Sequence, residues 1–154
     1  MQKIKTFLWF DDQAEEAAEF YVSVFGGDSR VQNVTHYAEG APVEAGRVMT
    51  VEFRLAGTEY VALNGGPQFP FTEAISLTVD CEDQAEVDRL WAALTEGGEE
   101  GQCGWLKDKY GLSWQIVPRG MVELFADPDR AKAERAMKAM MGMRKLDIEA
   151  VRNA

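Results

Sequence analysis

An internal repeat constrains the fold of this chain more than any other feature. The segment Asp12-Gln13-Ala14-Glu15 recurs as Asp83-Gln84-Ala85-Glu86, and at the same offset of 71 residues Gly26-Gly27 matches Gly97-Gly98. Six of the 16 positions from 12 to 27 are identical at this offset. Because both ends of the matched segment keep one offset, we expect two copies of a single structural unit.

Each copy is predicted to begin with a strand, continue through an amphipathic helix and return to strands. The first strands are expected over residues 3–10 and 74–80, which are rich in β-branched and aromatic residues. Later strands are expected over 31–39, 47–55 and 58–63 in one copy and over 102–107 and 113–118 in the other. The helices carry apolar residues at helical spacing: Ala17, Phe20, Tyr21 and Val24, then Val87, Leu90, Trp91 and Leu94. These two sets are 70 residues apart, and a glycine pair follows each helix.

The pattern predicts an α+β fold of two tandem βαβββ modules with mainly antiparallel strands around a shared groove, followed by C-terminal helices. A chain of 154 residues suits one domain, which we divide into a first module at 1–66, a second at 67–120 and a helical extension at 121–154. In the extension, Asp127-Pro128 is expected to cap and begin a helix. Its apolar stripe serves core or subunit packing or, alternatively, grips a ligand. The stripe consists of Ala131, Ala133, Met137, Met140 and Met141, and Asp147 is expected to cap a short helix over 146–151.

Charge and cysteine content narrow the possible partners and setting. Residues 1–120 hold 9 Lys and Arg against 20 Asp and Glu, and this acidic body repels phosphate backbones, so we expect no nucleic-acid partner. The apolar run near the N-terminus is too short to span a membrane, and no membrane partner is expected. Cys81 and Cys103 form no CxxC pair, and without a secretory signal they indicate reduced thiols in the cytoplasm.

Three segments resemble a known superfamily. Residues 20–27 are similar to an FYxxVFGG helix end of the vicinal oxygen chelate superfamily, which includes glyoxalases, bleomycin-resistance proteins and extradiol dioxygenases. Residues 74–79 and 103–118 resemble its PhnB-like branch, often labelled a 3-demethylubiquinone-9 3-methyltransferase domain. The resemblance implies a cup-shaped mixed sheet, a homodimer and a small-molecule site inside each cup.

The resemblance also implies positions for a divalent metal ion, and this chain lacks its usual ligands there. The matching positions fall on Thr6, on Ala74, on Gln115 and near Leu63 and Asn64, none of which is His, Asp or Glu. The chain contains a single histidine, His36. We therefore expect no metal site and no cofactor.

Strand alternation predicts which side chains face the cup. If Thr6 faces the cup, Leu8 and Phe10 do so as well, while Phe7 and Trp9 pack against the helix. In the second module Ser76, Thr78, Ser113 and Gln115 are expected on the cup side. Buried hydroxyl and amide groups need partners, so these groups are expected to pair with one another, with water or with a ligand. The predicted ligand-binding residues are Thr6, Leu8, Ser76, Thr78, Ser113 and Gln115.

Other residues carry weaker signals, and no catalytic residue is assigned. His36 is either structural or a general base, and Cys103 is either packed or reactive. Glu52 and Arg54 share a strand face and are expected to pair.

Three functions remain open from the sequence. The favoured hypothesis is a metal-free binding module for a small organic molecule. The alternative is a superfamily enzyme of isomerase, lyase, epimerase or oxygenase type with a displaced metal site or none, in which inward carboxylates such as Glu52 or Glu59 serve. A methyltransferase-related role in quinone metabolism follows from the family label alone, since the chain has no room for a separate nucleotide-binding domain.

Overall fold

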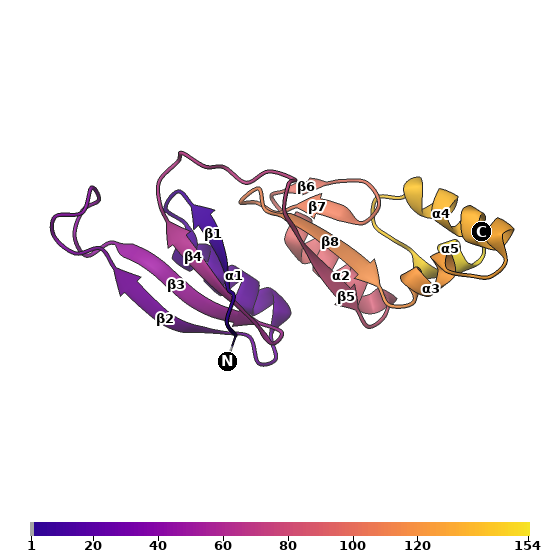
Figure 1. The fold of residues 1–154 in the computed structure, drawn as a ribbon, viewed down its shortest axis with the longest axis horizontal. Coiled ribbons are helices and arrows are strands. Elements are labelled where there is room, and N and C mark those ends of the chain that lie inside the picture. The colour runs from indigo at the N-terminus through magenta and orange to yellow at the C-terminus, as the bar shows by residue number, and fades with distance from the viewer. Residues whose placement is uncertain (1) are drawn as a thin grey trace. The chain divides into compact units, whose positions relative to one another are not determined.

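The computed structural model describes residues 2–154, which divide into two compact units between Phe71 and Thr72. The first unit contains β1 (Thr6–Phe10), α1 (Ala14–Phe25), β2 (Arg30–His36), β3 (Val48–Leu55) and β4 (Thr58–Asn64) (Figure 1). Its sheet has the strand order β1-β4-β3-β2, in which β1 and β4 are parallel and the other neighbours are antiparallel. The first unit therefore has the βαβββ order expected from the sequence.

The second unit has the same sheet order and carries the C-terminal helices. It contains β5 (Ser76–Cys81), α2 (Gln84–Thr95), β6 (Glu99–Glu100), β7 (Trp105–Lys107), β8 (Ser113–Pro118), α3 (Met121–Phe125), α4 (Arg130–Met141) and α5 (Ile148–Arg152). Its sheet has the order β5-β8-β7-β6, with β5 and β8 parallel. Across residues 2–154, two mixed four-stranded sheets and five helices confirm the α+β fold with two modules.

The strands expected over 3–10 and 31–39 are longer than β1 and β2, and the start of a third predicted strand is wrong because of the local backbone conformation. The strand expected over 102–107 begins only at Trp105. Cys103 and Gly104 have φ angles of 57° and 84°, a left-handed conformation that a strand does not accommodate. The short strand β6 was not predicted, because its two glutamates have low β propensity.

The two module helices begin 70 residues apart, which is the offset of their apolar residues and not the offset of 71 of the identical segments. The buried apolar residues therefore determine where the two helices correspond. Both helices have 12 residues, and they begin at Ala14 and Gln84. Asp83 caps α2 by accepting a hydrogen bond from the Glu86 backbone N–H at 2.9 Å. At the corresponding position before α1, Gln13 makes no side-chain cap.

The start of α1 is stabilised from another part of its unit. The Asn64 side chain, at the end of β4, accepts a hydrogen bond from the Ala14 backbone N–H at 2.8 Å. Its amide nitrogen also donates to the Val48 carbonyl at 3.1 Å. Asn64 thus ties together the helix start and two neighbouring strands of the first sheet.

The prediction that Thr6, Leu8 and Phe10 face away from the helix is wrong. Leu8 and Phe10 are each 3% exposed, whereas Phe7 is 60% exposed. The partners of Leu8 across the sheet, Ala62 and then Val51, are fully buried. On this same face the ring of Phe53 stacks on Tyr21 of α1, with 6.3 Å between their centroids. Helix α1 therefore covers the Leu8 face.

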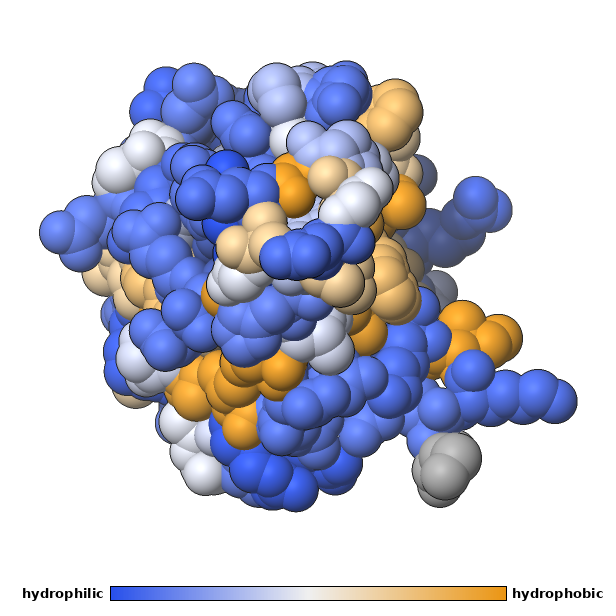
Figure 2. Space-filling view, turned by 90° about the vertical axis from the view of Figure 1, so that its left-hand side faces the viewer, coloured by the Kyte–Doolittle hydropathy of each residue, from blue (hydrophilic) through white to orange (hydrophobic). Residues whose placement is uncertain are grey.

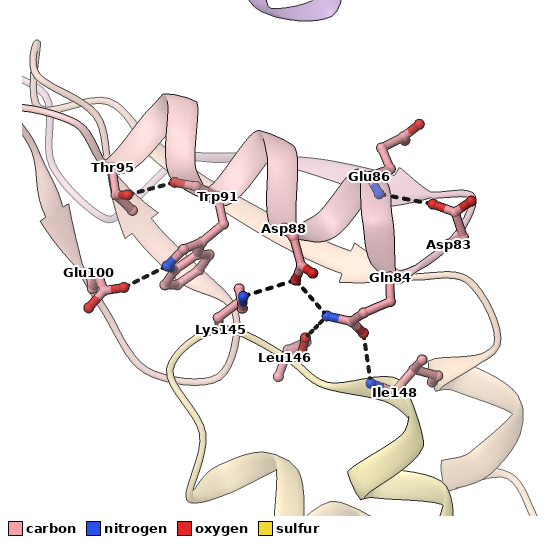
Figure 3. Close-up of polar contacts among 10 residues, drawn as sticks. All are labelled: Asp83, Gln84, Glu86, Asp88, Trp91, Thr95, Glu100, Lys145, Leu146 and Ile148. Atoms are coloured by element: carbon pink, nitrogen blue, oxygen red, sulfur yellow. Dashed lines mark hydrogen bonds and ion pairs between the residues drawn. The ribbon is translucent and has the colours of Figure 1, made fainter.

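The helices after β8 form a small core of their own. It contains Met121, Ala136, Leu146, Ile148 and Val151. Gln84, at the start of α2, holds the segment before α5 in place: its amide nitrogen donates to the Leu146 carbonyl at 2.8 Å, and its oxygen accepts from the Ile148 N–H at 3.0 Å (Figure 3). Lys145 lies 2.9 Å from the Asp88 carboxylate, and this contact lowers the Asp88 pKa.

In the extension, the N-terminal cap of α4 differs from the prediction and that of α5 agrees with it. Helix α4 is capped by Asp129, whose carboxylate accepts from the Ala131 and Lys132 N–H groups. The expected capping by Asp127-Pro128 is wrong, because Asp127 instead accepts from the Asp129 N–H in the turn before the helix. The expected cap of α5 by Asp147 is confirmed.

The predicted apolar stripe of α4 is also rotated. Ala136 is its buried residue, while Met137 and Met141 are 44% and 62% exposed. Packing of this helix therefore centres on Ala136 and not on the two outer methionines.

Hydrophilic residues dominate the surface seen in Figure 2, where apolar side chains form small patches. In the first unit Ile4, Phe7 and Phe69 are the exposed large hydrophobic residues among those described. None of the described helices is both long and apolar enough to cross a membrane.

Candidate functional site in the second module

Four of the predicted ligand-binding residues lie on one face of the second sheet. Ser76 pairs with Ser113 across β5 and β8, and Thr78 pairs with Gln115. Paired residues share a face of a sheet, and alternation places all four side chains on the same side. We call this side the polar face.

Strand β7 adds two residues to the polar face. Lys107 pairs with Ser113, and Trp105 pairs with Gln115. The polar face thus consists of two rows across the sheet, Ser76-Ser113-Lys107 and Thr78-Gln115-Trp105.

The opposite face of this sheet packs against α2, as the sequence predicts. Leu106, Trp114 and Ile116 are at most 2% exposed there. Glu100, which pairs with Leu106 in the sheet, accepts a hydrogen bond from the Trp91 indole of α2 at 2.6 Å (Figure 3). Helix α2 therefore packs on the Leu106 side of the sheet and not on the Ser113 side.

A cavity of about 190 Å³ lies at the β7 side of the polar face. Its lining residues are Glu73, Glu99, Glu100, Gly101, Trp105, Leu106, Lys107 and Ser113. We call it the β7 cavity. Its wall therefore combines an aromatic side chain, charged groups of both signs and a hydroxyl.

The hydroxyl groups of the polar face differ in whether they are paired. Gln115 donates a hydrogen bond to the Ser76 hydroxyl at 2.8 Å, so these two predicted residues satisfy each other. The Ser113 hydroxyl is fully buried and has no hydrogen-bond partner among the described residues. A buried polar group without a partner costs about 1–3 kcal/mol, so Ser113 is a place where a ligand gains by binding.

Two charged residues of the β7 cavity, Lys107 and Glu73, are exposed and lie beside each other. Lys107 forms an ion pair with Glu73, which raises the pKa of Lys107 and lowers the pKa of Glu73. Nearby Glu99 also raises the pKa of Lys107. Both members of the pair are substantially exposed, and exposed ion pairs contribute little to stability and rearrange easily.

The sequence did not predict that Trp105, Lys107 and Glu73 belong to this site. Trp105 and Lys107 reach it through the register of β7 on β8, and Glu73 lies before β5, outside any strand. Alternation within residues 102–107 places Trp105 and Lys107 on one face. This alternation places Trp105 and Lys107 beside Ser113 and Gln115 only once the register between β7 and β8 is known.

The first module offers a second cavity in which Tyr37 and Asn64 already have hydrogen-bond partners. It has a volume of about 210 Å³ and is lined partly by Tyr37, Arg47 and Asn64. The Tyr37 hydroxyl donates to the Asn64 carbonyl, and the Asn64 side chain binds Ala14 and Val48 as described above. Thr6 and Leu8 belong to this module and lie on the face of β1 that packs against α1.

The residues at the expected metal positions do not fit a divalent ion. No three His, Cys, Asp or Glu side chains gather at one point within residues 2–154. The two amide side chains at these positions are engaged elsewhere, Asn64 with Ala14 and Gln115 with Ser76.

The remaining sequence candidates Glu52, Glu59 and His36 belong to the first module. Glu52 and Glu59 both lie near Lys5 in the first module, at 3.8 Å and 3.7 Å. The expected Glu52–Arg54 pair is wrong, since Arg54 pairs with Asp28 at 3.3 Å. His36 is exposed at the end of β2.

Comparison with known proteins identifies the family. The model of the 3-demethylubiquinone-9 3-methyltransferase family matches residues 2–117. The chain belongs to this family. It is 37% identical to the PhnB protein from Bacillus cereus, with a TM-score of 0.69 over 76% of this chain and 99% of that one. Comparison with curated proteins gives no match.

Two further solved structures share the fold of this PhnB-like chain at low identity. Protein PA1353 from Pseudomonas aeruginosa is 21% identical, with a TM-score of 0.63 over 77% of this chain and 98% of that one. The fosfomycin resistance protein FosX from Mesorhizobium loti is 14% identical, with a TM-score of 0.57 over 82% of this chain and 100% of that one. The fold is that of the vicinal oxygen chelate superfamily.

The family name implies a methyl-donor nucleotide, and the residues of this PhnB-like chain do not fit one. In nucleotide-binding α/β domains a glycine-rich turn joins a parallel strand to a helix. Here β1 leads to α1 through Asp11-Asp12-Gln13, and β5 leads to α2 through Glu82-Asp83. These acidic turns contain no glycine that would let the backbone approach a nucleotide.

Proposed function

We propose that this PhnB-like protein binds a small organic molecule, without a chelated metal ion, on the polar face of the second sheet. The observation that carries the proposal is the buried, unpaired Ser113 hydroxyl beside the β7 cavity. A ligand atom that donates to or accepts from this hydroxyl recovers the cost of leaving it unpaired. Thr78 and the Ser76–Gln115 pair supply further polar contacts on the same face.

The proposal does not extend to a reaction. The carboxylates that an enzymatic alternative would use, Glu52 and Glu59, lie with Lys5 in the first module. No observation on the polar face favours an isomerase, lyase or oxygenase role over binding.

A thermal-shift screen against quinones, antibiotics and 2-oxo compounds tests the proposal. A compound at a hundredfold its dissociation constant stabilises the native state by about 2.7 kcal/mol, which for a chain of this size raises Tm by roughly 5–10 °C. Ser113→Ala removes the unpaired hydroxyl, so the free protein is expected to be as stable as the wild type or more stable. Its ligand-induced shift is expected to be smaller.

The control is Ser23→Ala, which removes an exposed hydroxyl from α1 and is expected to keep the full ligand-induced shift. An unchanged shift in Ser113→Ala would contradict the proposed site, and failure of every compound class would leave the binding function without support. Elemental analysis of protein purified without chelator is expected to find no stoichiometric Zn, Ni, Fe or Mn. About one ion per chain would contradict the metal-free part of the proposal.

We further propose that the protein is a cytoplasmic homodimer. The family resemblance and the exposed side chains Phe7 and Phe69 support association, and the free thiols Cys81 and Cys103 support a reducing compartment. Light scattering at micromolar concentration is expected to return twice the chain mass of 17.2 kDa, and the mass of one chain would contradict the dimer. Recovery in a membrane fraction would contradict the location.

A further inference from the structure

We infer that the ligand of the polar face is an organic cation, a protonated amine attached to an aromatic or aliphatic body. The inference rests on the proposed function, because it names the ligand class for the same site. It combines the charge of the β7 cavity with the unpaired hydroxyl of Ser113.

The wall of the β7 cavity carries an excess of negative charge. The residues around it include three that carry carboxylates, Glu73, Glu99 and Glu100, against the single ammonium of Lys107. Glu100 is committed elsewhere, since it binds the Trp91 indole and lies 3.7 Å from Arg144. Lys107 is left to balance both Glu73 and Glu99, so an entering cation meets a net attraction and an entering anion a net repulsion.

The Ser113 hydroxyl is the second observation, and it specifies a hydrogen-bond donor on the ligand. It is fully buried and unpaired among the described residues, and Ser113 is one of the residues that line the cavity. Its oxygen can accept an N–H from an ammonium group, and hydrogen bonds to charged groups are stronger than neutral ones. A cluster of carboxylates alone would attract any small cation, whereas the hydroxyl favours one that carries N–H groups.

The aromatic part of the lining accounts for the apolar body of the ligand. Trp105 lies in the row next to Ser113 and lines the same cavity. An indole ring offers both apolar contact area and a π face that attracts cations. An amine on an aromatic or aliphatic group satisfies the hydroxyl, the carboxylates and the indole together.

Lys107 competes with such a ligand for the same carboxylate. Its ion pair with Glu73 is exposed and therefore easily broken, so an incoming ammonium can take its place beside Glu73. Removal of the lysine charge therefore strengthens cation binding, whereas removal of a carboxylate weakens it. A role of Lys107 in gripping an anionic ligand would give the opposite result.

Affinities of three matched compounds for the full chain test the inference, measured from the ¹⁵N–¹H amide shifts of Ser113 and Gln115. The compounds are 2-phenylethylamine, neutral 2-phenylethanol and anionic phenylacetate. The amine is expected to bind about tenfold more tightly than the alcohol, and phenylacetate more weakly than either.

Charge variants provide the second arm of the experiment. Glu99→Gln is expected to weaken the amine about three- to tenfold, and Lys107→Met to tighten it by a similar factor, with little effect on the alcohol in either case. Glu19→Gln, on the exposed side of α1, is the matched control and is expected to change neither affinity.

Each alternative outcome identifies which claim has failed. Equal affinity for amine and alcohol at Ser113, or weaker amine binding in Lys107→Met, would overturn the cation inference while leaving the proposed binding site in place. If none of the three compounds shifts the signals of Ser113 and Gln115, the site itself is wrong.

Discussion

Replacement of Gln84 by alanine is expected to detach the C-terminal segment from α2. The Gln84 amide makes two partly buried hydrogen bonds, to the Leu146 carbonyl at 2.8 Å and from the Ile148 N–H at 3.0 Å (Figure 3). Each such bond contributes about 1 kcal/mol, and a polar group left unpaired adds to the loss. The bond to Asp88 is exposed and contributes little beyond these. We expect a loss of about 2–3 kcal/mol and a fall in Tm of roughly 5–10 °C.

Urea denaturation and calorimetry of the full chain measure this loss. Gln13→Ala is the matched control, because Gln13 precedes α1, is exposed and makes no side-chain cap, so its replacement is expected to be nearly neutral. Amide exchange supplies a local readout: the Ile148 N–H is expected to exchange faster in Gln84→Ala than in the wild type. An equal loss in both variants, or unchanged exchange at Ile148, would refute the assignment of Gln84 as the residue that holds this segment.

Two further predictions concern a buried carboxylate and the thiols. Asp108 is 2% exposed and accepts hydrogen bonds from the Leu112 N–H and the Trp114 indole. Asp108→Asn replaces one acceptor by a donor and is expected to lower the free energy of unfolding, measured in urea, by about 2–4 kcal/mol. A loss below about 1 kcal/mol would contradict this role of Asp108. Burial raises the pKa of the Cys81 thiol to about 12, so at pH 8 a thiol reagent is expected to label Cys103 alone until the protein unfolds. The pKa of the Cys81 thiol is higher in the folded protein than in the unfolded chain. The neutral thiol therefore contributes fully to stability at any pH below the pKa of the unfolded chain. This contribution is lost as the pH rises from there toward 12. Rapid labelling of both thiols in the native protein would contradict the burial of Cys81.

The two-module fold was predictable because helical and strand periodicities agree over most of the chain. Where identical segments and apolar spacing disagreed, at offsets of 71 and 70, the structure follows the apolar spacing. Burial of the helix face fixes the register: Ala14 is fully buried, whereas Ala85, which matches it in the second segment, is exposed, so the two segments do not coincide. Comparison of the two sequence copies does not predict the role of Asn64, because the bond that it makes to the start of α1 joins residues 50 positions apart.

Prediction of strand faces succeeded only where the two sets of side chains differ in polarity. In β5, Ser76 and Thr78 alternate with Leu77 and Val79, and the predicted face is confirmed. In β1 both alternating sets are apolar apart from Thr6, so periodicity could not determine which set packs against α1.

In the candidate site, the sequence predicts residues within one strand but not the pairing between strands. Ser113 and Gln115 follow from alternation within a single strand. Trp105 and Lys107 join them only through the register between two strands, which tertiary packing sets. Unpaired buried hydroxyls such as that of Ser113 are likewise visible only in three dimensions.

A crystal structure of the protein with a bound compound from the thermal-shift screen tests the central claim most directly. We expect ligand density in the β7 cavity, with a polar ligand atom within hydrogen-bond distance of the Ser113 hydroxyl and no metal ion between ligand and protein. Ligand density confined to the first-module cavity beside Tyr37 and Asn64, or a metal ion that joins the ligand to the chain, would contradict the account.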